Sequence, residues 1–416
     1  MSKVRTVEPQ RSQVEIRFDV PEDMLPPTHP ARVLWTLLGR LDLGRFTDGY
    51  RSVEGSAGRG LLSPRMMLTL WLYAISDGVG SAREIERLTN THTAYRWIVG
   101  TLKVSHHKLS GFRVGCRDAF DALFTDVVST LLHANLVSLS VMAQDGTRVR
   151  AAASAPSFRT YGSLLECREQ AALHLKAVLA AADDPEYTRA QHTCREAAAR
   201  DFENRVEAAI TTVEQMQKPR DSSDKKSPRA STTDAEARIM KMGDGGFRPA
   251  YNVQYAVVGD AGGGPRTIVG VQVTNVGSDM GSLSPMADQV EKRTGVLPET
   301  VLADGGHAKG EDIAELRRRG VDVIVPPHDR AKSIDQLKAE GADPEIIAWR
   351  EQMETEEAKQ LYRMRAGLCE LANAHQKSHQ AITEFLVRGI DKVTCVILMS
   401  GISANLLAHA AYLLSS

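Results

Sequence analysis

Three acidic residues stand where the chain has the types and spacing for metal-assisted chemistry. Asp145 and Asp304 each follow a short apolar run, and Glu370 lies in a long run of helix-forming residues. Sites in open α/β sheets form at the carboxyl ends of strands, so we expect the two aspartates to meet there. A helix packed on the sheet would add Glu370. Taken alone, the pair Asp145-Gly146 is typical of a turn.

Converging carboxylates predict a divalent cation site. Mg²⁺ prefers oxygen ligands, Mn²⁺ is expected to substitute for it, and two such ions can stabilise the attacking and leaving oxygens of phosphoryl transfer. Without a cation, the like charges would raise the pKa of at least one carboxyl group. We therefore predict that Asp145, Asp304 and Glu370 are catalytic residues that bind metal.

Residues 31–135 are predicted to be helical. Ser63-Pro64 places a capping hydroxyl before a proline at the first helical position, and Ser81 with Glu84 has the spacing of a capping box. These signals predict an all-helical N-terminal domain over residues 1–135.

The remainder alternates between strand and helix patterns. Residues 139–143 form a strand signal that stops at Asp145-Gly146 and resumes at 147–149. Residues 162–217 favour helix, and the Ser-, Asp- and Lys-rich residues 218–233 favour a flexible linker. Further strands are predicted at 251–258, 267–274, 300–303 and 321–325, and further helices at 281–292, 310–319, 346–375 and 382–414.

This order predicts a ribonuclease H-like α/β core with a mixed sheet. The first two of the later strands, joined by a turn at 260–264, are expected to pair antiparallel, whereas the strand–helix alternation after them indicates parallel pairing. The core would comprise residues 136–161 and 234–416, with residues 162–233 as a helical insertion and linker.

The composition predicts a folded protein that acts in the cytoplasm. Of 416 residues, 42% are hydrophobic and 25% charged, which is near the globular average. The five cysteines are scattered, no apolar run reaches the ~18 residues of a membrane span, and the first residues do not form a secretion signal. The net charge of −1 argues weakly against nucleic-acid binding, although 218–229 and 317–319 are locally basic.

The chain resembles the DDE transposases of bacterial insertion sequences, in the branch with a helical insertion after the first core strand. The resemblance extends from about residue 31 to 413. Its motifs are Gln144-Asp145-Gly146-Thr147-Arg148, Pro249-Ala250-Tyr251-Asn252-Val253-Gln254, Leu302-Ala303-Asp304-Gly305-Gly306, the set Tyr362, Arg365, Glu370 and Lys377, Phe385-Leu386-Val387-Arg388-Gly389, and, in the N-terminal region, Ser81 to Leu88 with Tyr95-Arg96-Trp97.

The resemblance implies recognition of terminal inverted repeats, strand cleavage by water and joining of the freed 3′ hydroxyl to target DNA. It implies that the N-terminal helical domain holds the DNA end, and that the protein acts on two DNA ends as a homodimer or larger assembly. The residues it suggests for DNA contact are Tyr362, Arg365, Lys377, Arg148, Asn252, Gln254 and Arg388.

Each of these suggestions has an alternative. Tyr362, Arg365 and Lys377 also fit the polar face of a surface helix. Asn252 and Gln254 alternate to one face of a strand, where they would orient Asp145 or a phosphate, or make ordinary strand hydrogen bonds. The basic strip 218–229 fits a solvated linker better than a DNA contact.

Three residues depart from the expected pattern or invite another role. His307 stands where a tyrosine is expected and is predicted to face solvent, and Asn373 stands where an aromatic residue is expected. Asp279 is interpreted as a helix N-cap rather than a fourth ligand. Zinc at the histidine pairs 106–107 and 375/379 is disfavoured because no Glu or Cys lies at a useful spacing.

Two rival functions remain open at this stage. One is a structure-specific nuclease of the same fold, which would cut DNA without joining it. The other is a decayed transposase that binds DNA but no longer cuts it. Only the products of the reaction distinguish these two functions from an active transposase.

Overall fold

The computed structural model describes residues 20–48, 60–181, 186–217, 227–259, 264–328, 332–380 and 382–415. Most of the predicted basic strip at 218–229 and most of the predicted turn at 260–264 lie outside these ranges.

The N-terminal region is helical, as predicted. Ser63 is the residue before the second α-helix and Pro64 is its first residue, while the Ser81 side chain accepts a hydrogen bond from the Glu84 amide. The elements are η1 (Pro21–Met24), α1 (Pro30–Leu38), η2 (Gly44–Phe46), α2 (Pro64–Ser76), α3 (Ala82–Thr91), α4 (Thr93–Val99), α5 (His106–Gly115) and α6 (Arg117–His133).

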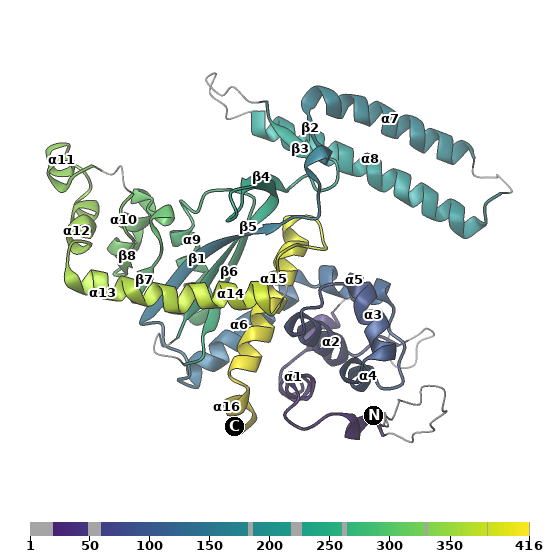
Figure 1. The fold of residues 1–416 in the computed structure, drawn as a ribbon, viewed down its shortest axis with the longest axis horizontal. Coiled ribbons are helices and arrows are strands. Elements are labelled where there is room, and N and C mark those ends of the chain that lie inside the picture. Colours follow the sequence, from purple (N-terminus) through teal and green to yellow (C-terminus); the bar gives the residue numbers. More distant parts are fainter. Residues whose placement is uncertain are drawn as a thin grey trace, which may run out of the picture.

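A mixed sheet follows, with the strand order and directions of a ribonuclease H-like core (Figure 1). Its strands are β1 (Val141–Arg150), β4 (Arg238–Lys241), β5 (Phe247–Val258), β6 (Thr267–Thr274), β7 (Thr300–Leu302) and β8 (Asp322–Ile324). The order is β4-β5-β1-β7-β8, and β6 also pairs with β5. As expected, β5 and β6 are antiparallel, and β1, β7 and β8 are parallel.

Strand β1 continues through Asp145-Gly146, so the predicted break in this strand is wrong. Its residues pair with β5 from Met142 to Arg150, whereas the parallel pairing with β7 ends at Ala143. The antiparallel partner satisfies the backbone of Asp145, which pairs with Tyr255. Asp145 therefore lies beyond the end of the parallel ladder but inside a continuous strand.

Two sets of helices pack on the sheet. Helices α9 (Leu283–Thr294) and α15 (Ile390–Ala408) pack on β6, and α15 also packs on α6 and α2. The segment Glu356–Ser378, which we call the rod, comprises α13 (Glu356–Arg365), the π-helix η5 (Ala366–Glu370) and α14 (Leu371–Ser378). Its middle packs on β1 and β5, and α13 reaches β7 and β8. In Figure 1 the rod crosses the sheet as one continuous run.

The remaining helices of the core are shorter. They are η4 (Gly305–His307), α10 (Gly310–Arg318), α11 (Ile334–Ala339), α12 (Pro344–Gln352) and α16 (Ala410–Ser415).

The last long helix begins at Ile390, eight residues later than the prediction of 382. The intervening chain runs beside β1 instead, where the Phe385 amide donates to the Arg150 carbonyl at 2.8 Å. Gly389, with φ of 88°, then allows the turn into α15. By length and composition α15 would also pass as a membrane span, but 61% of its most apolar window is buried in the protein, which is typical of a core helix.

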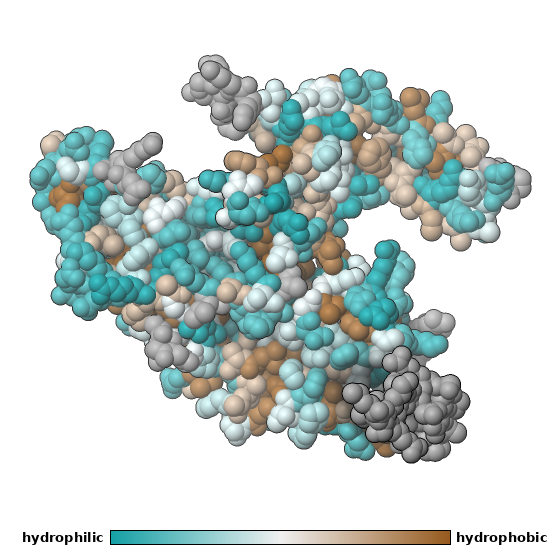
Figure 2. All heavy atoms as spheres, in the orientation of Figure 1, coloured by the Kyte–Doolittle hydropathy of each residue, from teal (hydrophilic) through white to brown (hydrophobic). Residues whose placement is uncertain are grey.

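The predicted insertion is a helical arm. Helices α7 (Tyr161–Ala180) and α8 (Arg189–Gln217) pack against each other, and the short strands β2 (Phe158–Thr160) and β3 (Arg229–Ser231) pair at their base, beside η3 (Ala155–Ser157). The arm has apolar clusters of its own, separate from the main core. Figure 2 shows it projecting from the body, with a wide recess between it and the N-terminal helices.

The N-terminal helices and the sheet share one hydrophobic core. Trp71 on α2, Phe124 on α6, Val271 on β6 and Leu398 on α15 belong to the same buried cluster. Asn135, with φ of 54°, follows α6 at the predicted domain boundary. The boundary therefore falls between two parts of the chain that pack against each other.

Candidate active site

Side-chain alternation along β1 sends Asp145 toward the rod. Ala143, two residues earlier, packs with Leu302, Ile324, Leu368 and Cys369 in an apolar cluster beneath the rod. Asp145 lies on the same face because side chains in a strand alternate with a period of two.

Asp304 follows β7 directly and is fixed by the turn that it begins. As the N-cap of η4, its Oδ1 accepts hydrogen bonds from the Gly306 amide at 2.9 Å and from His307 Nδ1 at 2.8 Å. Its Oδ2 faces the rod. Asp145 and Asp304 thus meet at one edge of the parallel strands, as the sequence predicts.

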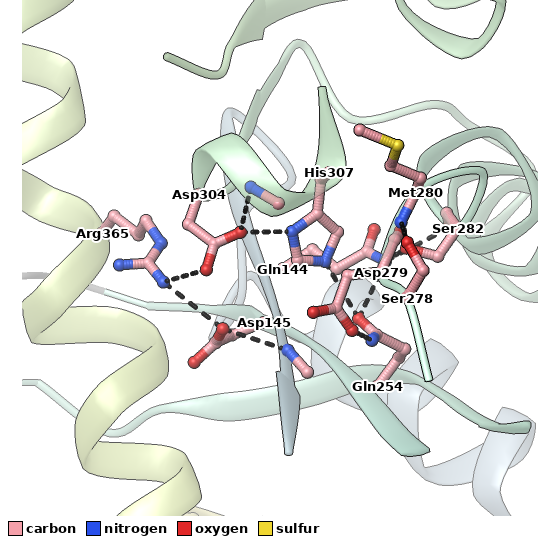
Figure 3. A network of polar contacts seen from close by, with 12 residues as sticks. Gln144, Asp145, Gln254, Ser278, Asp279, Met280, Ser282, Asp304, His307 and Arg365 are labelled. Atoms are coloured by element: carbon pink, nitrogen blue, oxygen red, sulfur yellow. Dashed lines mark hydrogen bonds and ion pairs between the residues drawn. The ribbon is translucent and has the colours of Figure 1, made fainter. Parts of the chain in front are cut away.

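Arg365 lies between the predicted acids (Figure 3). Its Nη2 is 3.3 Å from Asp145 Oδ1 and 3.6 Å from Asp304 Oδ2, and its Nη1 is 3.7 Å from Glu370 Oε1. The Arg365 side chain is 13% exposed, so this charge is mostly enclosed. All three predicted carboxylates therefore converge on one guanidinium.

The π-helix explains how Glu370 joins this group. Residues five apart in an α-helix lie ~140° apart around its axis, whereas an i→i+5 π turn brings them much closer to the same face. The turn at 366–370 therefore brings Glu370 near Arg365. The glutamate is much more open than the aspartates, with 64% of its side chain exposed, compared with 15% for Asp145.

Asn373, on α14, makes the second contact to Asp145. Its Nδ2 donates to Asp145 Oδ2 at 2.8 Å, while Asp145 Oδ1 also accepts from the Gly146 amide at 3.0 Å. Among the described residues, the buried Asn373 Oδ1 has no hydrogen-bond partner. The rod therefore contributes an arginine, an amide and a carboxylate to the site.

The two aspartates have opposite pKa shifts. Burial raises the pKa of Asp145, and the nearby Arg365 charge only partly opposes this effect. The hydrogen bond from His307 lowers the pKa of Asp304, with further help from the His307 and Arg365 charges. Asp145 is therefore the carboxylate whose charge depends most on a cation.

A second polar network lies on the other side of β1 (Figure 3). Asp279 accepts hydrogen bonds from Gln254 Nε2 at 2.6 Å, Asn252 Nδ2 at 2.8 Å and Arg148 Nη2 at 2.9 Å. His307 Nε2 lies 3.1 Å from Gln254 Oε1 and joins this network to Asp304. Asn252, Gln254, Asp279 and His307 are buried, Arg148 is partly exposed, and their polar atoms satisfy one another.

A side chain at Gly146 would crowd that network. A Cβ at this position would collide with Gln254 Nε2 and lie 2.5 Å from Asp279 Oδ1. The glycine beside Asp145 thus gives the buried side chains room to approach β1.

The oxygen donors suit a hard divalent cation. Asp145 and Asp304 contact the same guanidinium nitrogen, and the unpartnered Asn373 Oδ1 lies beside them. Mg²⁺ bonds of ~2.1 Å are more than an ångström shorter than the distances to that nitrogen, so Arg365 would have to withdraw. With Arg365 in place, the described part of the chain holds no group of three His, Cys, Asp or Glu residues arranged for a metal ion.

Comparison with protein families gives two matches. A family model described as a transposase domain matches residues 19–114, and one described as a transposase DDE domain matches residues 331–408. The chain belongs to the DDE transposases of insertion elements. No curated protein and no solved structure matches it.

The two family matches cover different parts of the transposase. The first covers α1 to α5, and the second runs from α11 to α15 and includes Glu370 and the whole rod. Asp145 and Asp304 lie in neither. The family is one of metal-dependent polynucleotidyl transferases that act on DNA, so the carboxylate cluster lies in the right kind of enzyme.

In the transposase, the residues predicted to contact DNA differ in how exposed they are. Lys377 and Arg388 are exposed, whereas Tyr362, on α13, is partly buried against the apolar cluster beneath the rod. Asn252 and Gln254 are each 1% exposed and, with Arg148, bind Asp279. Of the roles suggested for Asn252 and Gln254, their burial favours orientation of the site over phosphate contact.

Sequence reasoning gave the wrong environment for two residues. Asp279 is not the N-cap of α9, which is Ser282, because a turn intervenes and three side chains bind its carboxylate. His307 does not face solvent but is fully buried. Asn373 departs from the expected pattern, and the sequence alone assigns it no role. A signal was present, because polar Asn252 and Gln254 in an otherwise apolar buried strand require buried partners.

Proposed function

We propose that this transposase binds the terminal inverted repeats of its own element, cleaves the strands and joins the 3′ ends to target DNA. The reaction would take place in the bacterial cytoplasm, on nucleoid DNA. The proposal rests on one observation above all. Asp145, Asp304 and Glu370 come from three separate parts of the chain and converge on a single positive group.

The catalytic residues in this proposal are Asp145, Asp304 and Glu370, and they would hold Mg²⁺ or Mn²⁺. Two bound cations stabilise the charge on the attacking and leaving oxygens of phosphoryl transfer. Asp304 would offer Oδ2, because its Oδ1 already accepts two hydrogen bonds. Asp145 would be held in position by Asn373.

The rod would provide the phosphate contacts. Arg365 would move from the carboxylates to a DNA phosphate, since a guanidinium forms strong paired hydrogen bonds to phosphate oxygens. Lys377, on the rod, and Arg388, in the chain before α15, are exposed and would add positive charge for phosphate contact. Tyr362, Arg148, Asn252 and Gln254 would support the site rather than reach the DNA.

The separate parts of the chain would divide the DNA between them. We assign residues 1–135 to binding of the DNA end, 136–161 and 234–416 to the catalytic core, and 162–233 to the insertion. Two transposon ends must be processed together, so a homodimer or larger assembly would form on DNA. Light scattering of a complex holding two ends tests this, and a mass of one protein chain would contradict it.

The test of the chemistry uses labelled DNA from the flanks of the coding region. Wild type and Asp304→Asn are incubated with this DNA and Mg²⁺, then with Mn²⁺, and cleaved and joined products are separated. We expect both products in wild type and neither in the variant. Asn is nearly the same size as Asp but lacks the charge, so retention of binding by the variant excludes a folding defect.

The other outcomes identify the rivals. Cutting without joining would show a nuclease of the same fold. Binding without cutting in either metal would show a transposase that has lost its activity. Cleavage by Asp304→Asn at the wild-type rate would contradict the proposed site while leaving the family assignment intact.

A further inference from the structure

The carboxylate of Asp304 is fixed through one of its two oxygens. Oδ1 accepts two hydrogen bonds, from the Gly306 amide and from His307 Nδ1, whereas Oδ2 forms the ion pair with Arg365. The Asp304 side chain is 41% exposed, so packing alone does not restrain it. Its orientation depends on what holds Oδ1.

The His307 ring is itself fixed from the far side. Its Nε2 lies 3.1 Å from Gln254 Oε1, and Gln254 cannot turn over, because its Nε2 donates to Asp279 Oδ1 at 2.6 Å and to Asn252 Oδ1 at 3.2 Å. The ring therefore has an acceptor at each nitrogen. Its side chain is fully buried.

Asp279, at the far end of this series of contacts, is held by several hydrogen bonds. Asp279 accepts from Gln254, Asn252 and Arg148, and Arg148 also donates to the Gly277 carbonyl at 2.8 Å. Figure 3 shows the contacts running without a gap from Asp279 through Gln254 and His307 to Asp304. A buried network whose members are paired holds its groups in one arrangement.

We propose that His307 is a positioning residue, which holds Asp304 Oδ1 so that only Oδ2 is presented to the divalent cation. The buried contacts of Gln254 and Asp279 would fix the ring, and through it the angle of the carboxylate. This inference rests on the proposed role of Asp304 as a metal ligand. It gives a function to the histidine that interrupts the expected pattern, and to Gln254, Asn252 and Arg148, which lie too deep or are too engaged to serve DNA.

Two substitutions test the contacts of the two ring nitrogens of His307 separately. The amide nitrogen of an Asn side chain can take the place of Nδ1, so His307→Asn keeps a donor to Asp304 and loses the contact to Gln254. The amide nitrogen of Gln takes the place of Nε2, so His307→Gln keeps the contact to Gln254 and loses the donor to Asp304. His307→Ala loses both. Each variant leaves Asp304 unchanged.

Mn²⁺ binding to the full chain is measured by electron paramagnetic resonance of the free ion. Urea unfolding measures the stability of each variant separately. Loss of a group that orients a metal ligand typically weakens affinity by ~10- to 100-fold. We expect this loss in His307→Gln and His307→Ala, and a value within ~3-fold of wild type in His307→Asn. If His307→Gln does not fold, the recovery from Ala to Asn carries the test.

A space-filling role predicts a different order. If the ring only fills volume, the larger Gln would be tolerated at least as well as Asn, and Mn²⁺ affinity would follow unfolding stability. That order, or wild-type affinity in His307→Gln and His307→Ala, would overturn the inference.

Asp304→Asn distinguishes this failure from failure of the proposed function. Loss of Mn²⁺ binding in Asp304→Asn alone would leave the metal site standing and remove only the role of His307. Equal Mn²⁺ binding by wild type and Asp304→Asn would contradict the metal site and the inference together.

Discussion

Arg365 lies closest to Asp145 among the three carboxylates that surround its guanidinium, with Nη2 at 3.3 Å from Asp145 Oδ1. Burial raises the pKa of Asp145, so a nearby positive charge matters most there. A guanidinium in this place supplies the charge that a divalent cation would otherwise supply. While it contacts the carboxylates, the Arg365 side chain, which is suited to phosphate, is not available to DNA. The two ligands proposed for this region, cation and DNA, would thereby be linked through one residue.

Removal of Arg365 should strengthen cation binding in the absence of DNA. In Arg365→Gln the carboxylates lose the positive group that competes with the cation, and we expect Mn²⁺ affinity to rise about tenfold, equivalent to ~1.4 kcal/mol. Titration calorimetry of the DNA-free protein measures this change. Binding of DNA should weaken in the same variant, because the phosphate contact proposed for Arg365 is lost.

Arg363→Gln is the matched control. This residue lies on the same helix, is exposed, and makes no ion pair or hydrogen bond recorded among the described residues. It should leave Mn²⁺ affinity unchanged. An unchanged Mn²⁺ affinity in Arg365→Gln as well would mean that the guanidinium does not compete with the cation.

The metal-free protein should show an opposite pH dependence for the two aspartates. The folded-state pKa of Asp145 is above the ordinary value of 3.8, so the folded state loses stability as pH rises from 3.8 through that raised pKa. Asp145→Asn lacks this loss. The difference in unfolding free energy, variant minus wild type, should therefore increase with pH in that window and then level off. Urea unfolding in chelator across pH 4 to 8 measures it.

Asp304 supplies the comparison for that experiment. Its pKa is below 3.8 when folded, mainly because of the His307 hydrogen bond, so its stabilising contribution is fully present above 3.8 and is lost only as pH falls through the lowered pKa. Between pH 4.5 and 8 the difference between Asp304→Asn and wild type should change less than the difference for Asp145→Asn, since the Asp304 charge enters there only by helping to raise the pKa of Asp145. A steeper change for Asp304→Asn, or a flat line for Asp145→Asn, would show that the shifts have been assigned to the wrong carboxylates.

The sheet was predictable because its pattern is local. Residues 267–274 are mostly β-branched and are bounded by turn residues, and β6 has those bounds. The prediction failed where distant partners decide. An Asp-Gly pair favours a turn in isolation, yet pairing with β5 keeps Asp145 in strand. The chain at 382–389 has helix-forming residues but pairs with the end of β1.

The candidate site was predictable only in part for a similar reason. Strand ends and helix spacing indicated that Asp145, Asp304 and Glu370 meet. The partners of Asp304 and Asp279 come from 2 to 131 residues away in sequence, and no periodic pattern links such positions. The π turn at 366–370 also changes which side chains face one another along the rod, and a count based on 3.6 residues per turn does not include it.

The salt dependence of DNA binding tests whether Lys377 contacts a phosphate. It is exposed and has no ion pair within the described ranges of the chain. In Lys377→Ala the slope of log affinity against log salt should decrease in size by about 0.9, the value for one phosphate contact. Lys359→Ala is the control, since Lys359 is paired with Glu356 at 2.8 Å. Equal slopes for both variants would remove Lys377 from the DNA surface.

Gly146→Ala tests whether the motif glycine serves the buried network rather than a turn. Gly146 does not have a positive φ, so its backbone suits alanine, and any cost must come from the new Cβ against Gln254 and Asp279. Overpacking of this kind costs ~1 to 3 kcal/mol of unfolding free energy, and urea unfolding measures it. Gly162→Ala, in α7 with no atom within 4 Å of the added carbon, should instead gain ~0.5 to 1 kcal/mol. Equal stability of Gly146→Ala and wild type would mean that Gln254 and Asp279 move apart at no cost, and that the network does not hold His307 firmly.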